Sequence, residues 1–279
     1  MSGILKKQGW LAALLGLVFP LAVLAEPAQG VGDSADTAPR AAPHAAAHAA
    51  PQASTHASPG RGPAAKAAPA SRPPRASAIR HARIQRWNRD GFEAYERDDM
   101  TRAVAAYGHA AQAGDASAQY NLAVIRLRDE SRQPSLARAL ALLRSSAQAG
   151  FAPAQYMLAS LHETGRLVAR SLTDALAWNQ RAAEQGHVDA ALALATQHYL
   201  GRGTPQDYVL AARWYERAAD GGDVAAQYTL ASMYATGLGV KTDLQAALLW
   251  YSAAGRQGDI AAQWQARALA ERLSREPSS

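Results

Sequence analysis

Arginine and histidine side chains in the second half of this chain are the residues best suited to binding a charged ligand. A guanidinium group presents a planar fork of N–H donors that matches a carboxylate, so arginines on one helix face can hold an acidic segment. Six arginine or histidine residues lie on expected helices, at positions where the residue type varies along the chain: Arg102, His109, Arg138, Arg181, Arg213 and Arg217. We expect them to form a partner-binding groove, and the alternative is an ordinary solvated helix face.

No cluster of side chains in the sequence predicts catalysis. His162 and His198 are 36 residues apart and in phase with Tyr234, which favours a shared packing position over a catalytic one. The acidic pair Asp98 and Asp99 lies just before an expected helix, where capping explains it better than acid–base chemistry. We therefore predict a protein that is not an enzyme, with no catalytic residue, no metal and no cofactor.

The composition narrows the classes of function further. The chain has no cysteine, which excludes disulfides, thiol catalysis and cysteine-ligated zinc. Its formal net charge is +6, but residues 79–279 hold 22 Arg and Lys against 20 Asp and Glu. The positive excess lies mostly before residue 79, so net charge gives no support to nucleic-acid binding by the remainder of the chain.

The N-terminal segment has the pattern of an export signal. Lys6 and Lys7 precede an apolar run that ends at Ala25, which predicts a secretory signal peptide over residues 1–25 with cleavage after Ala25. The alternative is an uncleaved anchor, because residues 9–25 approach the minimum length of a membrane span. We expect an exported protein, periplasmic or secreted, or one anchored in the inner membrane by that segment.

Residues 26–78 have the composition of a spacer. Ala or Pro accounts for 28 of these 53 residues. A segment of this composition has too few large apolar side chains to offset the entropy of ordering the chain. His44, His48 and His56 lie in this segment without an acidic partner, so we do not expect them to bind a metal. The prediction is a disordered Ala/Pro-rich linker.

From residue 79 onward the chain repeats with a period of 36 residues. Glycines mark the period at Gly114, Gly150, Gly186, Gly222 and Gly258. A fixed period of this length is typical of helical hairpins that bury their apolar faces by stacking on their neighbours. Two columns hold only alanine: Ala103, Ala139, Ala175, Ala211 and Ala247, then Ala118, Ala154, Ala190, Ala226 and Ala262. We expect these alanines where helices cross closely.

Larger apolar residues form two further columns, which we expect to supply the core. They are Ala106, Leu142, Trp178, Trp214 and Trp250 on the first helix of each unit, and Tyr120, Tyr156, Leu192, Tyr228 and Trp264 on the second. The first helices have predicted N-caps at Asp99, Ser135, Ser171, Asp207 and Asp243. The periodic glycines are predicted to end the first helices in a left-handed conformation.

One unit carries the most complete motif of small and aromatic residues: Ala211, Trp214, Tyr215, Ala218, Ala219, Gly222, Ala226, Gln227, Tyr228, Leu230, Ala231, Met233, Tyr234, Gly237, Gly239 and Val240. This motif resembles the Sel1-like repeat family, a branch of the tetratricopeptide superfamily. The resemblance implies an all-α, right-handed superhelical solenoid of helix-turn-helix repeats. It also implies that the six Arg and His residues face the concave side of that solenoid.

The period and the resemblance together divide the chain into units. A capping helix at residues 79–98, in which Trp87, Phe92 and Tyr95 pack under the first unit, precedes five repeats. The repeats are 99–134, 135–170, 171–206, 207–242 and 243–273, the last including a C-terminal cap, and a tail follows at 274–279.

The resemblance implies a non-catalytic scaffold or regulator of the bacterial cell envelope that binds protein segments along its concave face. The partner would be an envelope or secreted protein, and no nucleic acid is expected. One alternative is a structural assembly factor for a secretion or surface-polysaccharide apparatus. A less favoured alternative is an enzyme acting on cell wall or β-lactams. The branch of the family linked to β-lactams is rich in cysteine, whereas this chain has none.

Overall fold

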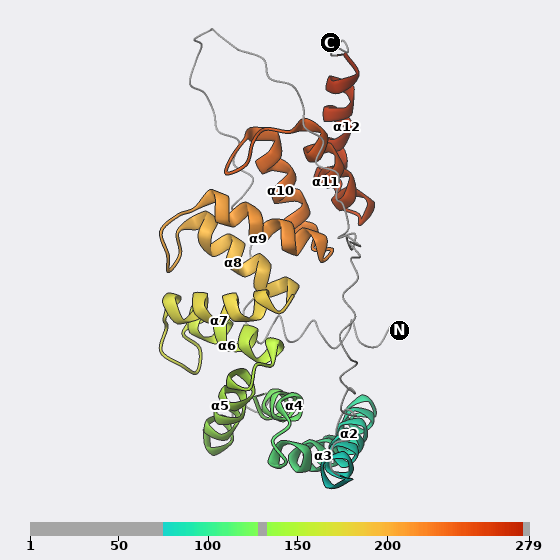
Figure 1. Cartoon of the computed structure of the whole chain (residues 1–279), viewed down its shortest axis with the longest axis vertical. Helices are drawn as coiled ribbons and strands as arrows, with labels where there is room; N and C mark the ends of the chain where they lie inside the picture. The colour runs from blue at the N-terminus through green and yellow to red at the C-terminus, as the bar shows by residue number, and fades with distance from the viewer. Residues whose placement is uncertain (1–74, 128–132, 276–279) are drawn as a thin grey trace, which may run out of the picture. The chain divides into compact units, whose positions relative to one another are not determined.

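The computed structural model describes residues 75–127 and 133–275 (Figure 1). Within these ranges the chain forms eleven α-helices and no strand. They are α2 (Arg75–Glu96), α3 (Met100–Gln112), α4 (Ala116–Leu127), α5 (Gln133–Gln148), α6 (Ala152–Thr164), α7 (Leu172–Glu184), α8 (Val188–Leu200), α9 (Tyr208–Asp220), α10 (Val224–Thr236), α11 (Leu244–Arg256) and α12 (Ile260–Arg275). The predicted signal peptide and nearly all of the predicted linker lie outside the described residues.

Each helix packs against the helices before and after it in the sequence, from α2 to α12. The first helices of the units are α3, α5, α7, α9 and α11, and the second helices are α4, α6, α8, α10 and α12. This arrangement confirms the predicted all-α solenoid of stacked helical hairpins. The helix α2, which precedes the first unit, starts at Arg75, four residues before the predicted capping helix.

The two alanine columns lie where the sequence predicts them. All ten alanines, Ala103 and Ala118 among them, have no exposed surface. A methyl group is the largest side chain that fits where the helix backbones approach this closely. The small-residue columns are therefore confirmed as the close contacts between helices.

The prediction that the two columns of larger residues supply the core holds in part, because most of them pack against the core clusters without being fully buried. The tryptophan column is half-buried, and Trp264 is 69% exposed rather than part of the core. Full burial lies in two neighbouring columns instead: Tyr107, Leu143, Asn179, Tyr215 and Tyr251 on first helices, and Leu122, Leu158, Leu194 and Leu230 on second helices. Since one residue turns a helix by about 100°, neighbouring positions on a helix differ strongly in burial.

The position of Trp264 at the last repeat explains its exposure. Its in-phase counterpart Tyr228 packs edge-on against Tyr251 of the following unit, with ring centroids 5.3 Å apart. No described helix follows α12, so Trp264 has no equivalent neighbour within the described residues. At the other end, Trp87 and Tyr95 pack against the first unit as predicted, but Phe92 is 51% exposed.

The turns follow the sequence signals with one exception. The five periodic glycines have φ between 85° and 100°, which confirms the left-handed ends. The side chains of Asp99, Ser171, Asp207 and Asp243 accept hydrogen bonds from backbone N–H groups of the first turn, as predicted for N-caps. Ser135 is not an N-cap, because α5 already begins at Gln133. Proline at position 134 is compatible with this start, since the first turn needs no N–H donor from it.

Candidate functional site

The predicted partner-binding residues all lie at exposed positions of first helices. Arg102 and Arg138 are near the starts of α3 and α5, and Arg213 is in the middle of α9. His109, Arg181 and Arg217 share one phase of the repeat on α3, α7 and α9. The structure thus distributes the six residues over four helices.

Two of the arginines adopt the same arrangement in consecutive units. The Arg181 guanidinium lies 4.6 Å from the ring centroid of Trp178, and that of Arg217 lies 4.8 Å from the ring centroid of Trp214. Residues three apart on a helix are neighbours, and a cation is attracted to an indole face. A guanidinium over an indole ring still has N–H donors available for a further partner.

The tryptophans below these cations belong to the packing of the solenoid, as expected from their phase. Trp178 and Trp214 are half-buried and pack against the apolar core clusters. Each indole therefore has one side in the core and one face under an arginine. A related ring contact occurs on α3, where His109 stacks on Trp87 with centroids 5.4 Å apart and an interplanar angle of 28°.

A column of glutamines on the second helices links the two helices of a hairpin. The Nε2 groups of Gln119, Gln155, Gln227 and Gln263 donate to the carbonyls of Ala111, Ala147, Ala219 and Gly255, at 3.4, 3.1, 3.1 and 2.8 Å. Gln185 and Gln257 extend the link to the next unit by donating to Gln155 Oε1 at 2.7 Å and Gln227 Oε1 at 2.9 Å. Our sequence reasoning missed this set, although spacings of 36 and 72 residues make it visible.

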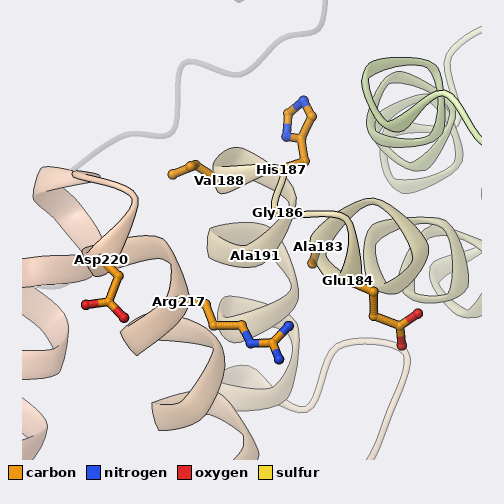
Figure 2. Close-up of a pocket in the computed structure, with 8 residues that line it drawn as sticks. All are labelled: Ala183, Glu184, Gly186, His187, Val188, Ala191, Arg217 and Asp220. Atoms are coloured by element: carbon orange, nitrogen blue, oxygen red, sulfur yellow. The ribbon is translucent and has the colours of Figure 1, made fainter. Parts of the chain in front are cut away.

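The glutamine column is interrupted between the third and fourth units. Ala191 stands in phase with Gln155 and Gln227, and Gly221 stands in phase with Gln185 and Gln257. A pocket with a volume of about 280 Å³ lies at this interruption. Figure 2 shows Arg217 and Asp220 of α9 on one side of it, with Glu184 and His187 at the turn between α7 and α8 on the other.

His187 caps the helix that borders this pocket. Its Nδ1 accepts a hydrogen bond of 3.3 Å from the Ala190 backbone N–H, at the position where Asp223 caps α10. Its ring lies 4.9 Å from that of Tyr156. Burial lowers the pKa of His187 below its ordinary 6.5, and the Asp189 carboxylate opposes this shift only in part. The shift favours the neutral imidazole, the form whose Nδ1 can accept the capping hydrogen bond.

This cap makes stability depend on pH. Because folding lowers the His187 pKa, the folded chain binds that proton less tightly than the unfolded chain. The contribution of neutral His187 is complete above its unfolded pKa of 6.5 and is lost as the pH falls through the folded value. We expect the parent chain to lose stability as the pH falls from about 7 to about 5. In the same range His187→Asp, which places the residue type of Asp223 at this cap, should lose about 1 kcal/mol less.

The measurement is urea unfolding of both proteins at the two pH values. His198, whose pKa burial also lowers, is present in both proteins, so their difference isolates position 187. Equal pH dependence of the two proteins would show that His187 does not cap α8 in solution.

The comparisons with known proteins identify the family. A family model of the Sel1 repeat matches residues 116–151, 152–187, 188–223 and 224–259, about half of the chain and with the same 36-residue period. The chain belongs to the Sel1 repeat family. Sel1 repeat proteins generally mediate protein–protein interactions as non-enzymatic scaffolds. The matched segments begin at second helices, so they divide the same hairpins at a different turn from the predicted repeats.

Solved structures of Sel1 repeat proteins are similar to this chain. A protective antigen present in uropathogenic Escherichia coli strains, which displays the Sel1-like repeat fold, is 27% identical with a TM-score of 0.62. The similarity covers 73% of this chain but only 44% of that antigen. A Sel1 repeat protein from Oxalobacter formigenes is 26% identical with a TM-score of 0.57, covering 68% of this chain and 86% of that one. Curated proteins gave no match.

None of the helices in residues 75–127 and 133–275 is long and apolar enough to cross a membrane. In the same part of the chain, no three His, Asp or Glu side chains are grouped as a metal site would require.

Proposed function

We propose that this Sel1 repeat protein is a non-catalytic scaffold or regulator that binds acidic segments of partner proteins along the exposed face of its first helices. The observation that carries this proposal is a repeated contact in which a guanidinium lies over an indole ring, Arg181 over Trp178 and Arg217 over Trp214. A segment lying along consecutive units would meet the same oriented cation twice. Arg213 adds a further charge one helical turn before Arg217.

This contact suits these arginines to carboxylate recognition. A free arginine loses side-chain entropy when it binds, whereas contact with the indole already restricts the guanidinium before the partner arrives. The N–H donors can then form paired hydrogen bonds with a carboxylate. The resemblance to the family implies that this face is the concave one, and a concave face would suit extended or helical segments laid along it.

The proposed location is the bacterial cell envelope. Lys6, Lys7 and the apolar run up to Ala25 support export to the periplasm or beyond, or anchoring in the inner membrane by residues 9–25. Residues 26–78 would then act as a spacer between that segment and the repeats. The partner would accordingly be an envelope or secreted protein.

Charge reversal at Arg213 and Arg217 tests the binding face. We expect Arg213→Glu with Arg217→Glu to reduce capture of the partner from an envelope extract at least about tenfold, because each charge-assisted hydrogen bond contributes about 1.5–3 kcal/mol. The measurement is quantitative mass spectrometry of proteins retained by the full-length chain.

The matched control reverses two other exposed first-helix arginines, Arg144→Glu with Arg256→Glu, which changes net charge equally. Retention of the same proteins by the parent and the 213/217 variant would remove this face from consideration. Loss in both double variants would point to net charge alone. The identities of the retained proteins would also separate a regulator from an assembly factor.

A further inference from the structure

We propose that the pocket between the third and fourth units binds a primary carboxamide, the side chain of a glutamine or asparagine in the partner segment. This inference deepens the proposed function, since the carboxamide belongs to the segment bound beside Arg217. It is carried by the interruption of the glutamine column. The repeats themselves show which chemical group occupies this place elsewhere in the solenoid.

The first acceptor in the pocket is the Ala183 carbonyl. In the four other units the equivalent carbonyl accepts two hydrogen bonds, one from the backbone N–H of the hinge glycine and one from a glutamine amide. Ala147 accepts from Gly150 N at 3.1 Å and from Gln155 Nε2 at 3.1 Å. Ala183 accepts from Gly186 N at 2.9 Å, but the in-phase methyl group of Ala191 cannot donate the second bond.

The second acceptor is the Gly186 carbonyl. One unit later, Gln257 Nε2 donates to the equivalent carbonyl of Gly222 at 3.1 Å and to Gln227 Oε1 at 2.9 Å. In the fourth unit the residue in phase with Gln257 is Gly221, which has no side chain to donate. Ala183 and Gly186 both line the pocket, and the carbonyls of their in-phase counterparts are the ones that accept from glutamines elsewhere.

The rest of the pocket suits an amide with an aliphatic stem. Val188 and Ala191 provide apolar walls for methylene groups, and the volume of about 280 Å³ exceeds that of one such side chain. Arg217 in the lining can donate to the amide oxygen, while Glu184 and Asp220 can accept from its N–H groups. A carboxamide uses donors and acceptors together, whereas a lysine ammonium offers donors only.

A side chain introduced at position 221 could not readily fill the gap in the glutamine column. A Cβ atom added there would overlap Cγ2 of Val188, so the third and fourth units approach each other in the space that a side chain would need. Position 191 lines the pocket, and the four other units carry glutamine in phase with it. Ala191→Gln should therefore restore the column and occupy the pocket from within the chain.

The experiment is a titration of the full-length, ¹⁵N-labelled chain with N-acetyl-glutaminamide, followed by amide chemical shifts. We expect saturable shifts at Gly186, Val188 and Ala191 with a dissociation constant in the millimolar range, as befits a probe of this size. In Ala191→Gln the shifts at Gly186 and Val188 should disappear while the melting temperature is retained or raised.

Three results would overturn the assignment: no saturable shift in the parent chain, equal shifts in Ala191→Gln, or equal or tighter binding of N-acetyl-lysinamide at the same residues. The last would assign the pocket to a cation. Because the probe requires no partner protein, failure here leaves the arginine-dependent capture experiment unaffected. Conversely, probe binding without arginine-dependent capture would retain the pocket and remove the acidic-segment proposal.

Discussion

Gly239→Ala is expected to destabilise the solenoid by at least about 3 kcal/mol, the sum of two separate effects. Gly239 has a φ of 72°, a left-handed conformation that costs a residue with a Cβ atom about 1–2 kcal/mol. The added Cβ would also overlap the backbone carbonyl and the Cβ atom of Tyr208, the first residue of α9. A carbonyl fixed at a helix start cannot move aside as the tip of a flexible side chain can.

Gly222→Ala provides the matched control. Gly222 has a φ of 90°, but a Cβ added there would meet no atom within 4 Å. This variant therefore bears only the conformational effect, about 1 kcal/mol. The measurement is the free energy of unfolding in urea for both variants. Equal losses at the two sites would mean that the loop after α10 does not lie against α9. Gly203 should behave like Gly239, because a Cβ atom added there would come 2.6 Å from the Leu172 carbonyl oxygen.

The fold could be predicted from the sequence because stacking leaves a direct trace in the residues. A hinge such as Gly222 must be left-handed in every unit, and Ala211 must remain small wherever two helices cross. Both requirements recur every 36 residues, so alignment at that period exposes them. The start of α5 escaped prediction because Ser135 has the side chain of an N-cap but lies inside a helix that begins earlier.

The candidate site was harder to predict because it depends on departures from the period. Ala191 and Gly221 are visible in the sequence as breaks in glutamine columns, yet only the packing shows that a pocket lies at Ala191 and that Val188 closes the space beside Gly221. The contact of Arg217 with Trp214 likewise requires the actual side-chain positions. What the sequence did indicate was that function lies among the residues that change between repeats.

Leu230→Ala is expected to cost about 2–5 kcal/mol, the usual range for removing a fully buried leucine side chain. Leu230 is 1% exposed and belongs to the core cluster that joins α8, α9 and α10. Truncation would leave a cavity in the cluster that also contains Leu194 and Tyr215, where packed helices limit how far the surroundings can collapse into it. Thermal and urea unfolding monitored by circular dichroism would measure the loss.

Trp264→Ala is the control that separates the observed core from the column first expected to supply it. Trp264 is the larger residue, but its 69% exposure means that truncation should change stability by about 0.5 kcal/mol or less. If size and hydrophobicity decided the outcome, the tryptophan variant would be the less stable of the two. A loss at Trp264 as large as that at Leu230 would show that this side chain is covered in solution. Because each unit of a solenoid contacts only its neighbours, such a result would place the covering element directly on α12.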